Sequence, residues 1–176
     1  MRLFFAAFPG PEIRRLIASI TAAIGTKEAR LVPPENYHMT FAFVGEVSRE
    51  LAVALRVIGA AVRCPPFEVC FDAYECWQKP EVVVAVASEC PAAVLELHRA
   101  LHAEIGRLGL PADPLAFRAH ITLARKVTQA SVLKPMSKFS WAVRDFQLVR
   151  SARSAEGSVY TVVDSWPLLD NAGRGA

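Results

Sequence analysis

Hydrophobic positions along this chain recur with two periods, one typical of helices and one typical of strands. Apolar residues spaced by three and four predict three amphipathic helices, over 13–24, 51–62 and 94–108. Ser48 stands shortly before the second of these and is its expected N-cap, because a serine hydroxyl can accept from the first turn. Each helix is therefore expected to bury one face against another element.

The other apolar segments are short, lie between turn residues and predict β-strands. They lie at 2–8, 29–32, 38–44, 67–74, 82–87, 117–125, 139–150 and 158–163. The last two are expected to form a closing hairpin. Strict alternation puts Ala42 and Val44 on the face of His38, and Phe43 on the opposite, more apolar face, which should pack on a helix.

Two of these strands contain the same motif, His-x-Thr followed by a large apolar residue. It occurs at His38-Met39-Thr40-Phe41 and again at His120-Ile121-Thr122-Leu123. On a strand, side chains two apart lie on the same face, about 7 Å apart, so each histidine projects together with its threonine. Each copy then pairs a group that titrates near neutral pH with a hydroxyl that can donate to an anionic oxygen. Two such pairs facing each other would supply a general acid, a general base and a phosphate-binding site.

The order of elements is the same in both halves of the chain: strand, helix, loop and His-x-Thr strand. This order predicts an α+β fold of two pseudo-symmetric lobes, each an antiparallel sheet with outer helices, around a central groove. We expect residues 1–170 to form a single two-lobed domain. Residues 171–176 are small and polar and are expected to form a frayed tail.

Composition limits the partners and the compartment. No apolar run in the 176 residues approaches the roughly 20 that a membrane span needs, so no membrane contact is expected. The first apolar run is too short for a signal peptide, and the four cysteines have no Cys-x-x-Cys spacing, which together predict a cytoplasmic protein with free thiols. The net charge of +3 fits a small phosphate-bearing partner better than an extended nucleic acid. We expect a monomer.

The chain resembles the RNA 2′,3′-cyclic phosphodiesterases, also called 2′-5′ RNA ligases, of the two-histidine phosphoesterases. Besides the two motifs, the similar segments are Arg2 to Ala7, Val32 to Tyr37, Phe43 to Val47, Pro65-Pro66-Phe67 and Ala124-Arg125. The resemblance implies that His38 donates a proton to the leaving 3′ oxygen and that His120 accepts one from the attacking water. Thr40 and Thr122 would donate to the non-bridging phosphate oxygens. It implies no metal and no cofactor.

The family pattern His-x-Thr-x-x-Arg implies that Arg125 binds substrate, although on a regular strand it would face away from Thr122. Arg118 is expected on the face of His120, two positions away, and is a second substrate-binding candidate. Many family members have proline directly before the second histidine, where this chain has Ala119.

Other residues have two interpretations each. Tyr37 would either stack on a base or pack in the core. Arg30 and Lys79 are weaker phosphate-binding candidates. His98 and His102 lie four apart on the third predicted helix, a spacing that allows metal binding, but without an evident third ligand a solvated flank is the expected place for them.

These observations predict hydrolysis of RNA 2′,3′-cyclic phosphate ends to 2′-phosphomonoesters by two-histidine general acid/base catalysis, with RNA ends or small cyclic nucleotides as partners. One alternative is the reversible joining of RNA ends through a 2′-5′ bond at the same site. Another is a non-catalytic module that binds RNA ends or nucleotides. The sequence leaves these alternatives open, because all of them use the same groove.

Overall fold

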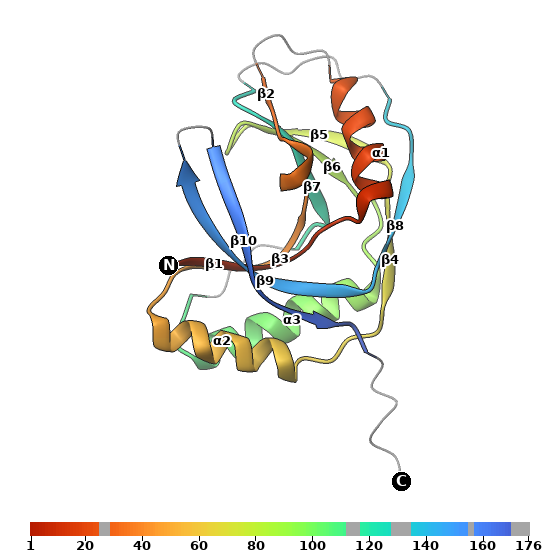
Figure 1. Cartoon of the computed structure of the whole chain (residues 1–176). Helices are drawn as coiled ribbons and strands as arrows, with labels where there is room; N and C mark the ends of the chain where they lie inside the picture. The colour runs from red at the N-terminus through yellow and green to blue at the C-terminus, as the bar shows by residue number, and fades with distance from the viewer. Residues whose placement is uncertain (25–28, 112–116, 128–134, 155–156, 170–176) are drawn as a thin grey trace.

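The computed structural model of the protein describes residues 1–24, 29–111, 117–127, 135–154 and 157–169. These residues form two four-stranded antiparallel sheets, a two-stranded sheet and helices that cover them (Figure 1). The predicted α+β class with two lobes is confirmed. Residues 170–176 lie outside the described residues, so the frayed tail stays a prediction.

The first sheet has the strand order β10-β9-β1-β3 and contains the first His-x-Thr motif. Its strands are β1 (Arg2–Ala7), β3 (Met39–Glu46), β9 (Asp145–Ser154) and β10 (Gly157–Pro167). β1 lies between β3 and β9, and its residues from Leu3 to Ala7 are all buried. β9 and β10 form the predicted closing hairpin.

The second sheet has the order β2-β7-β6-β5 and contains the second motif. Its strands are β2 (Arg30–Leu31), β5 (Ala73–Trp77), β6 (Val82–Val86) and β7 (His120–Arg125). A separate pair joins β4 (Phe67–Phe71) to β8 (Phe139–Val143). The predictions of unbroken strands over 67–74 and 139–150 are wrong, since the chain leaves one sheet and enters another at Asp72 and at Arg144. At the first break the Asp72 carboxylate accepts from the backbone N–H of Ser88 at 3.0 Å.

Two of the helices pack across from one lobe to the other. The helices are α1 (Pro11–Ala22), α2 (Arg49–Ala61), α3 (Ala92–Arg107) and the short η1 (Pro34–Asn36). α3 connects two strands of the second sheet but packs on β3 of the first sheet, whereas α1 lies beside the second sheet (Figure 1). There the Tyr74 hydroxyl donates to the backbone carbonyl of Ile20 at 2.9 Å. One hydrophobic core therefore extends through both lobes.

The N-cap prediction for α2 is confirmed, because the Ser48 hydroxyl accepts from the backbone N–H of Leu51 at 3.3 Å. The buried stripe of α2 is the predicted one, with Leu55 and Ile58 inside. Along the described parts of the chain, no helix combines the length and the apolarity that crossing a bilayer requires.

A β-bulge directly after each His-x-Thr motif changes which side chains face the groove. Between β1 and β3 the pairing passes from Ala42 to Thr40, so Phe41 has no partner residue; between β6 and β7, Leu123 is skipped in the same way. Two consecutive residues then point into the core at each bulge, and the next side chain returns to the groove. This is why the strict alternation predicted for 38–44 is wrong, with Ala42 buried and Phe43 43% exposed.

The backbone carbonyls of the two skipped residues have partners outside the bulged pairings. Val32 N–H donates to the Leu123 carbonyl at 2.8 Å, and His98 Nδ1 lies 2.7 Å from the Phe41 carbonyl. A carbonyl oxygen can only accept, so this nitrogen of His98 donates. The expectation of a solvated flank is therefore wrong for His98, which is partly buried and bonds across to the first lobe.

Candidate active site

Side chains from both sheets line a groove of about 370 Å³ between the lobes. The two His-x-Thr motifs face each other across it, as the sequence predicted. The lining residues are Arg2, Phe4, His38, Thr40, Phe43, His120, Thr122, Arg125, Ser151, Arg153, Ser158 and Tyr160. The lining is cationic and hydroxyl-rich, and no carboxylate is among the described residues that form it, so it suits an anionic ligand.

Each histidine is held in the same tautomer by the backbone that precedes it. His38 Nδ1 lies 2.7 Å from the carbonyl of Asn36, and His120 Nδ1 lies 2.8 Å from the carbonyl of Arg118. Both Nδ1 atoms must therefore donate, because a carbonyl oxygen only accepts. The free lone pair of each neutral ring is consequently on Nε2, which can take up a proton and give it back.

Aromatic residues surround His38. The ring centroids of Phe4, Phe8 and Tyr160 lie 5.2, 5.4 and 4.9 Å from the imidazole, and the Phe8 ring is stacked on it. This apolar environment disfavours the imidazolium form and lowers the pKa of His38 from its usual 6.5 to about 4. The bond to the Asn36 carbonyl acts in the opposite direction, and the nearby positive charge of Arg125 adds to the lowering.

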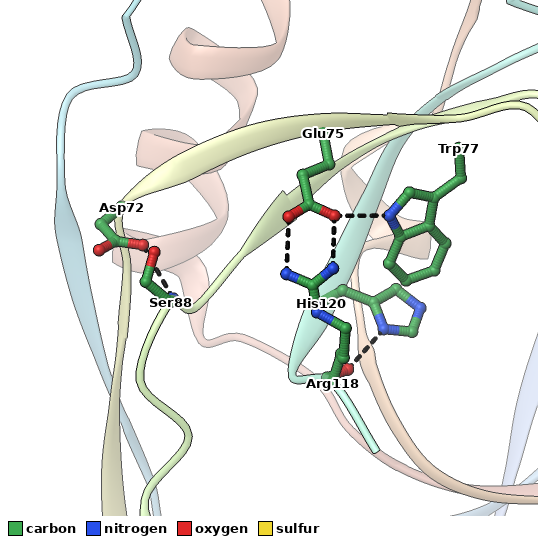
Figure 2. Close-up of polar contacts among 6 residues, drawn as sticks. All are labelled: Asp72, Glu75, Trp77, Ser88, Arg118 and His120. Carbon is green, nitrogen blue, oxygen red and sulfur yellow. Dashed lines mark hydrogen bonds and ion pairs between the residues drawn. The ribbon is translucent and has the colours of Figure 1, made fainter. Parts of the chain in front are cut away.

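His120 lies against the indole ring of Trp77, with the centroids 4.6 Å apart. Figure 2 shows how that indole is held: its N–H donates to the Glu75 carboxylate at 2.8 Å. The same carboxylate accepts hydrogen bonds from both terminal nitrogens of Arg118, at 2.6 and 2.8 Å. Because the Arg118 carbonyl binds His120, one connected network fixes both the face and the edge of this ring. Burial lowers the pKa of His120; the Arg118 carbonyl opposes this and the Arg118 charge adds to it.

The threonines and Arg125 complete an anion-binding arrangement between the histidines. Thr40 and Thr122 line the groove beside their histidines and are partly buried. The bulge at Leu123 turns Arg125 to the groove side of β7, which explains the His-x-Thr-x-x-Arg spacing. A phosphate between the rings would meet two hydroxyl donors and a guanidinium, which favour charge on its non-bridging oxygens.

A family model described as the 2′-5′ RNA ligase superfamily matches residues 9–155. The chain belongs to this superfamily. It is similar to the RNA 2′,3′-cyclic phosphodiesterase of Escherichia coli, with 33% identity over 169 residues, 95% of this chain and 96% of the relative. A protein of the same name from Thermus thermophilus is 31% identical, with 99% of this chain and 93% of the relative covered.

Solved structures agree with the membership in the 2′-5′ RNA ligase superfamily. The structure of E. coli LigT complexed with 3′-AMP matches with a TM-score of 0.90 at 32% identity, over 96% of this chain and 98% of that chain. LigT has also been solved in complex with ATP and with NADP+. The fold described above is therefore that of a known superfamily.

Some predicted site residues of this superfamily member lie away from the groove. Tyr37 is only 2% exposed and belongs to the core, so its ring offers no face to a base and the core interpretation is the right one. Arg118 is bound to Glu75 and lines neither the groove nor the cavity beside it. Lys79 also lines neither of them, whereas Arg30 lines the adjoining cavity.

Sequence reasoning missed several residues that shape the groove, chiefly Tyr160, Trp77, Arg153 and Arg2. Tyr160 and Arg153 belong to the C-terminal hairpin, which reaches the groove only because β9 pairs with β1. No local signal in the sequence reveals that long-range pairing. Arg2 could have been found, since it alternates with Phe4 on β1, and its guanidinium lies 4.8 Å above the Phe43 ring.

Among the described residues, no three histidine, cysteine, aspartate or glutamate side chains gather in a way that could hold a metal ion. The groove instead offers nitrogen bases, hydroxyl groups and cations. These groups can bind an anionic ester and transfer protons on either side of it.

Proposed function

We propose that this protein hydrolyses RNA 2′,3′-cyclic phosphate ends to 2′-phosphomonoesters. The observation on which this depends is the pair of His-x-Thr motifs, which approach one groove from two different sheets with both imidazoles in the same tautomer. The relatives named RNA 2′,3′-cyclic phosphodiesterase and the nucleotide complexes of LigT support it. Two imidazoles on opposite sides of phosphorus suffice for this reaction.

In the proposed reaction, His120 Nε2 takes a proton from water as the water oxygen forms its bond to phosphorus. His38 Nε2 gives a proton to the 3′ oxygen as the bond from phosphorus to that oxygen breaks. The product keeps its phosphate on the 2′ oxygen. This division of roles follows the family resemblance, and Thr40 and Thr122 donate to the non-bridging oxygens where negative charge grows.

The proton donor becomes protonated more readily when the substrate is bound. In the ligand-free protein both pKa values lie below 6.5, so both rings are mostly neutral at pH 7. A bound cyclic phosphate brings one negative charge beside the rings, and a nearby negative charge favours the imidazolium form. Substrate binding therefore raises both pKa values and favours protonation of the donor.

This coupling predicts the pH dependence of the reaction. A general acid must be protonated and a general base neutral, so the lowered pKa values place the optimum of kcat/KM below about pH 6.5, with a fall of about tenfold per pH unit well above it. The optimum of kcat is expected at higher pH, because kcat reports the substrate-bound protein. Both profiles are measured by initial rates between about pH 4 and pH 9. A kcat/KM optimum above pH 7 would contradict the role given to the buried rings.

The proposal is tested by identifying the product. We expect a short RNA with a 2′,3′-cyclic phosphate end to give a 2′-phosphomonoester, resistant to periodate and stable to a 3′-specific phosphatase, with EDTA present throughout. Formation of the 3′-phosphomonoester would mean that the other ester bond breaks. The absence of turnover, together with tight binding of the RNA, would favour the binding module.

End joining is tested in the same experiment by adding a second RNA with a 5′-hydroxyl end. A 2′-5′ linked product that grows with acceptor concentration would show that the ribose hydroxyl competes with water at the groove. A cytoplasmic location and a monomeric state remain expectations, which fractionation and light scattering would test.

A further inference from the structure

We infer that the cavity next to the histidine groove binds a second phosphate, the one that links the terminal nucleotide of the substrate to its upstream neighbour. The preferred substrate is then an oligonucleotide end rather than a mononucleoside cyclic phosphate. This inference rests on the proposed function, because it concerns the same ligand one phosphate further along the chain.

The cavity is about 500 Å³ and opens directly from the groove. The two share one wall, which includes His38, Thr122 and Arg125. A ligand whose cyclic phosphate lies between the histidines can therefore continue into the cavity. Beyond the shared wall, the cavity is lined by β2, by the loop around Pro33 and Asn36, and by the start of β10.

The charge of the cavity exceeds what one cyclic phosphate needs. Arg30, Arg125, Lys126 and Arg153 line it, and no aspartate or glutamate belongs to its described lining. Arg30 and Lys126 line this cavity and not the groove. A cyclic phosphate carries a single negative charge, and each upstream linkage of an RNA adds another. Two extra cations beside the reactive site thus match the next phosphodiester.

Arg30 is placed to bridge the two lobes at this point. It lies on β2 of the second sheet, and its Nη2 would be 2.9 Å from a Cβ added to Gly157, on β10 of the first sheet. A side chain at position 157 would crowd the guanidinium in this position. The wall beside it is tied to β10 as well, since the Asn36 side-chain amide donates to the Ser158 carbonyl at 2.9 Å.

Lys126 has an unusual backbone for a residue with a side chain, with φ at +60°. The conformation directly follows β7, where the backbone N–H of Val127 donates to the Glu81 carbonyl at 3.1 Å. A left-handed non-glycine residue is uncommon, and such residues concentrate at ligand sites. Here the left-handed conformation of Lys126 ends β7, and Lys126 lines the cavity next to Arg125.

The test compares three substrates: adenosine 2′,3′-cyclic phosphate, the diadenosine with a phosphodiester linkage and a 2′,3′-cyclic phosphate end, and the same dinucleotide with a neutral methylphosphonate linkage. We expect kcat/KM to be about tenfold higher for the charged dinucleotide than for the other two, since one charge-assisted contact is worth about that much. Equal values for the charged and neutral linkages would overturn the inference.

The variants Arg30→Gln and Lys126→Gln remove the two cations that the groove does not share. Each is expected to lower kcat/KM for the charged dinucleotide several-fold to about tenfold and to leave the mononucleotide unchanged within about twofold. Arg99→Gln is the matched control, because Arg99 is exposed on α3 and lines neither site. An equal loss for all three substrates would place these residues in the catalytic groove and overturn the second subsite.

The outcome also separates this inference from the proposed function. If the wild-type protein hydrolyses none of the three substrates, the proposed function fails. The subsite is then decided by calorimetric affinity for the charged and the neutral dinucleotide. Tighter binding of the charged one, lost in Arg30→Gln, would support the subsite without any turnover.

Discussion

The His120→Ala variant is expected to hydrolyse cyclic phosphate ends about 10²- to 10⁴-fold more slowly than the wild-type protein, and His38→Ala to show a loss of the same order. Each substitution removes the imidazole that is proposed to take or give a proton on one side of the phosphate, while leaving the threonines and Arg125 in place. The loss should therefore fall on kcat more than on KM. Single-turnover rates with a cyclic-phosphate RNA, measured at the pH optimum, give the comparison.

The double variant and a control distinguish catalysis from a merely structural role. Two groups that act in one transition state are not additive, so the double variant should lose little beyond the more damaging single change. His102→Ala is the matched control, since it lies on α3 and lines neither cavity. Retention of more than a tenth of the activity in either single variant, with native far-ultraviolet circular dichroism, would contradict the two-histidine mechanism.

The motif pair and the fold class could be predicted because they depend on local patterns. Apolar spacing locates α2 with its cap at Ser48, and the repeated His-x-Thr strands imply two facing lobes. A side chain two positions from another on a strand lies on the same face as long as no bulge falls between them. The placement of His38 beside Thr40, and of His120 beside Thr122, therefore required no knowledge of tertiary structure. That the two pairs share one groove is inferred from the repeated order of elements and the family resemblance.

The bulges could not be predicted from the same alternation. An extra residue in one strand depends on how the neighbouring strand is paired, and this information is absent from the local sequence. One bulge brings Arg125 into the groove and the other exposes Phe43 there. The two bulged segments, Thr40 to Phe43 and Thr122 to Arg125, have the same spacing, so Phe43 is the counterpart of Arg125 in the first lobe. The pseudo-symmetry thus extends beyond the motif, with an aromatic residue replacing a cation.

Long-range packing sets the environment of each histidine. Tyr160 reaches His38 through the C-terminal hairpin, and Trp77 reaches His120 from a strand two away from β7. These contacts make the two rings unequal: three aromatic rings surround His38, whereas one indole and a charged network hold His120. The sequence shows two equivalent motifs, and the structure shows that their surroundings differ.

Thr122→Val is expected to lower kcat by about 10²- to 10³-fold, the usual cost of removing one donor to an oxygen that gains charge in the transition state. Valine has nearly the same shape as threonine but no hydroxyl, so packing in the groove is preserved while the donor is lost. Thr122 lines both the groove and the adjoining cavity, directly between His120 and Arg125 along β7. Loss of the Thr122 hydroxyl therefore removes a hydrogen bond to the phosphate that Arg125 alone does not replace.

Thr122→Ser is the matched control, since it keeps the hydroxyl and removes only a methyl group. We expect it to retain activity within about tenfold of the wild-type value, because a serine hydroxyl is the same kind of donor with more rotational freedom. If Thr122 binds the ground state and the transition state equally well, Thr122→Val raises KM and leaves kcat unchanged. If both variants lose activity equally, the methyl group and not the hydroxyl is what the site needs, and the proposed stabilisation of the phosphate by Thr122 is wrong.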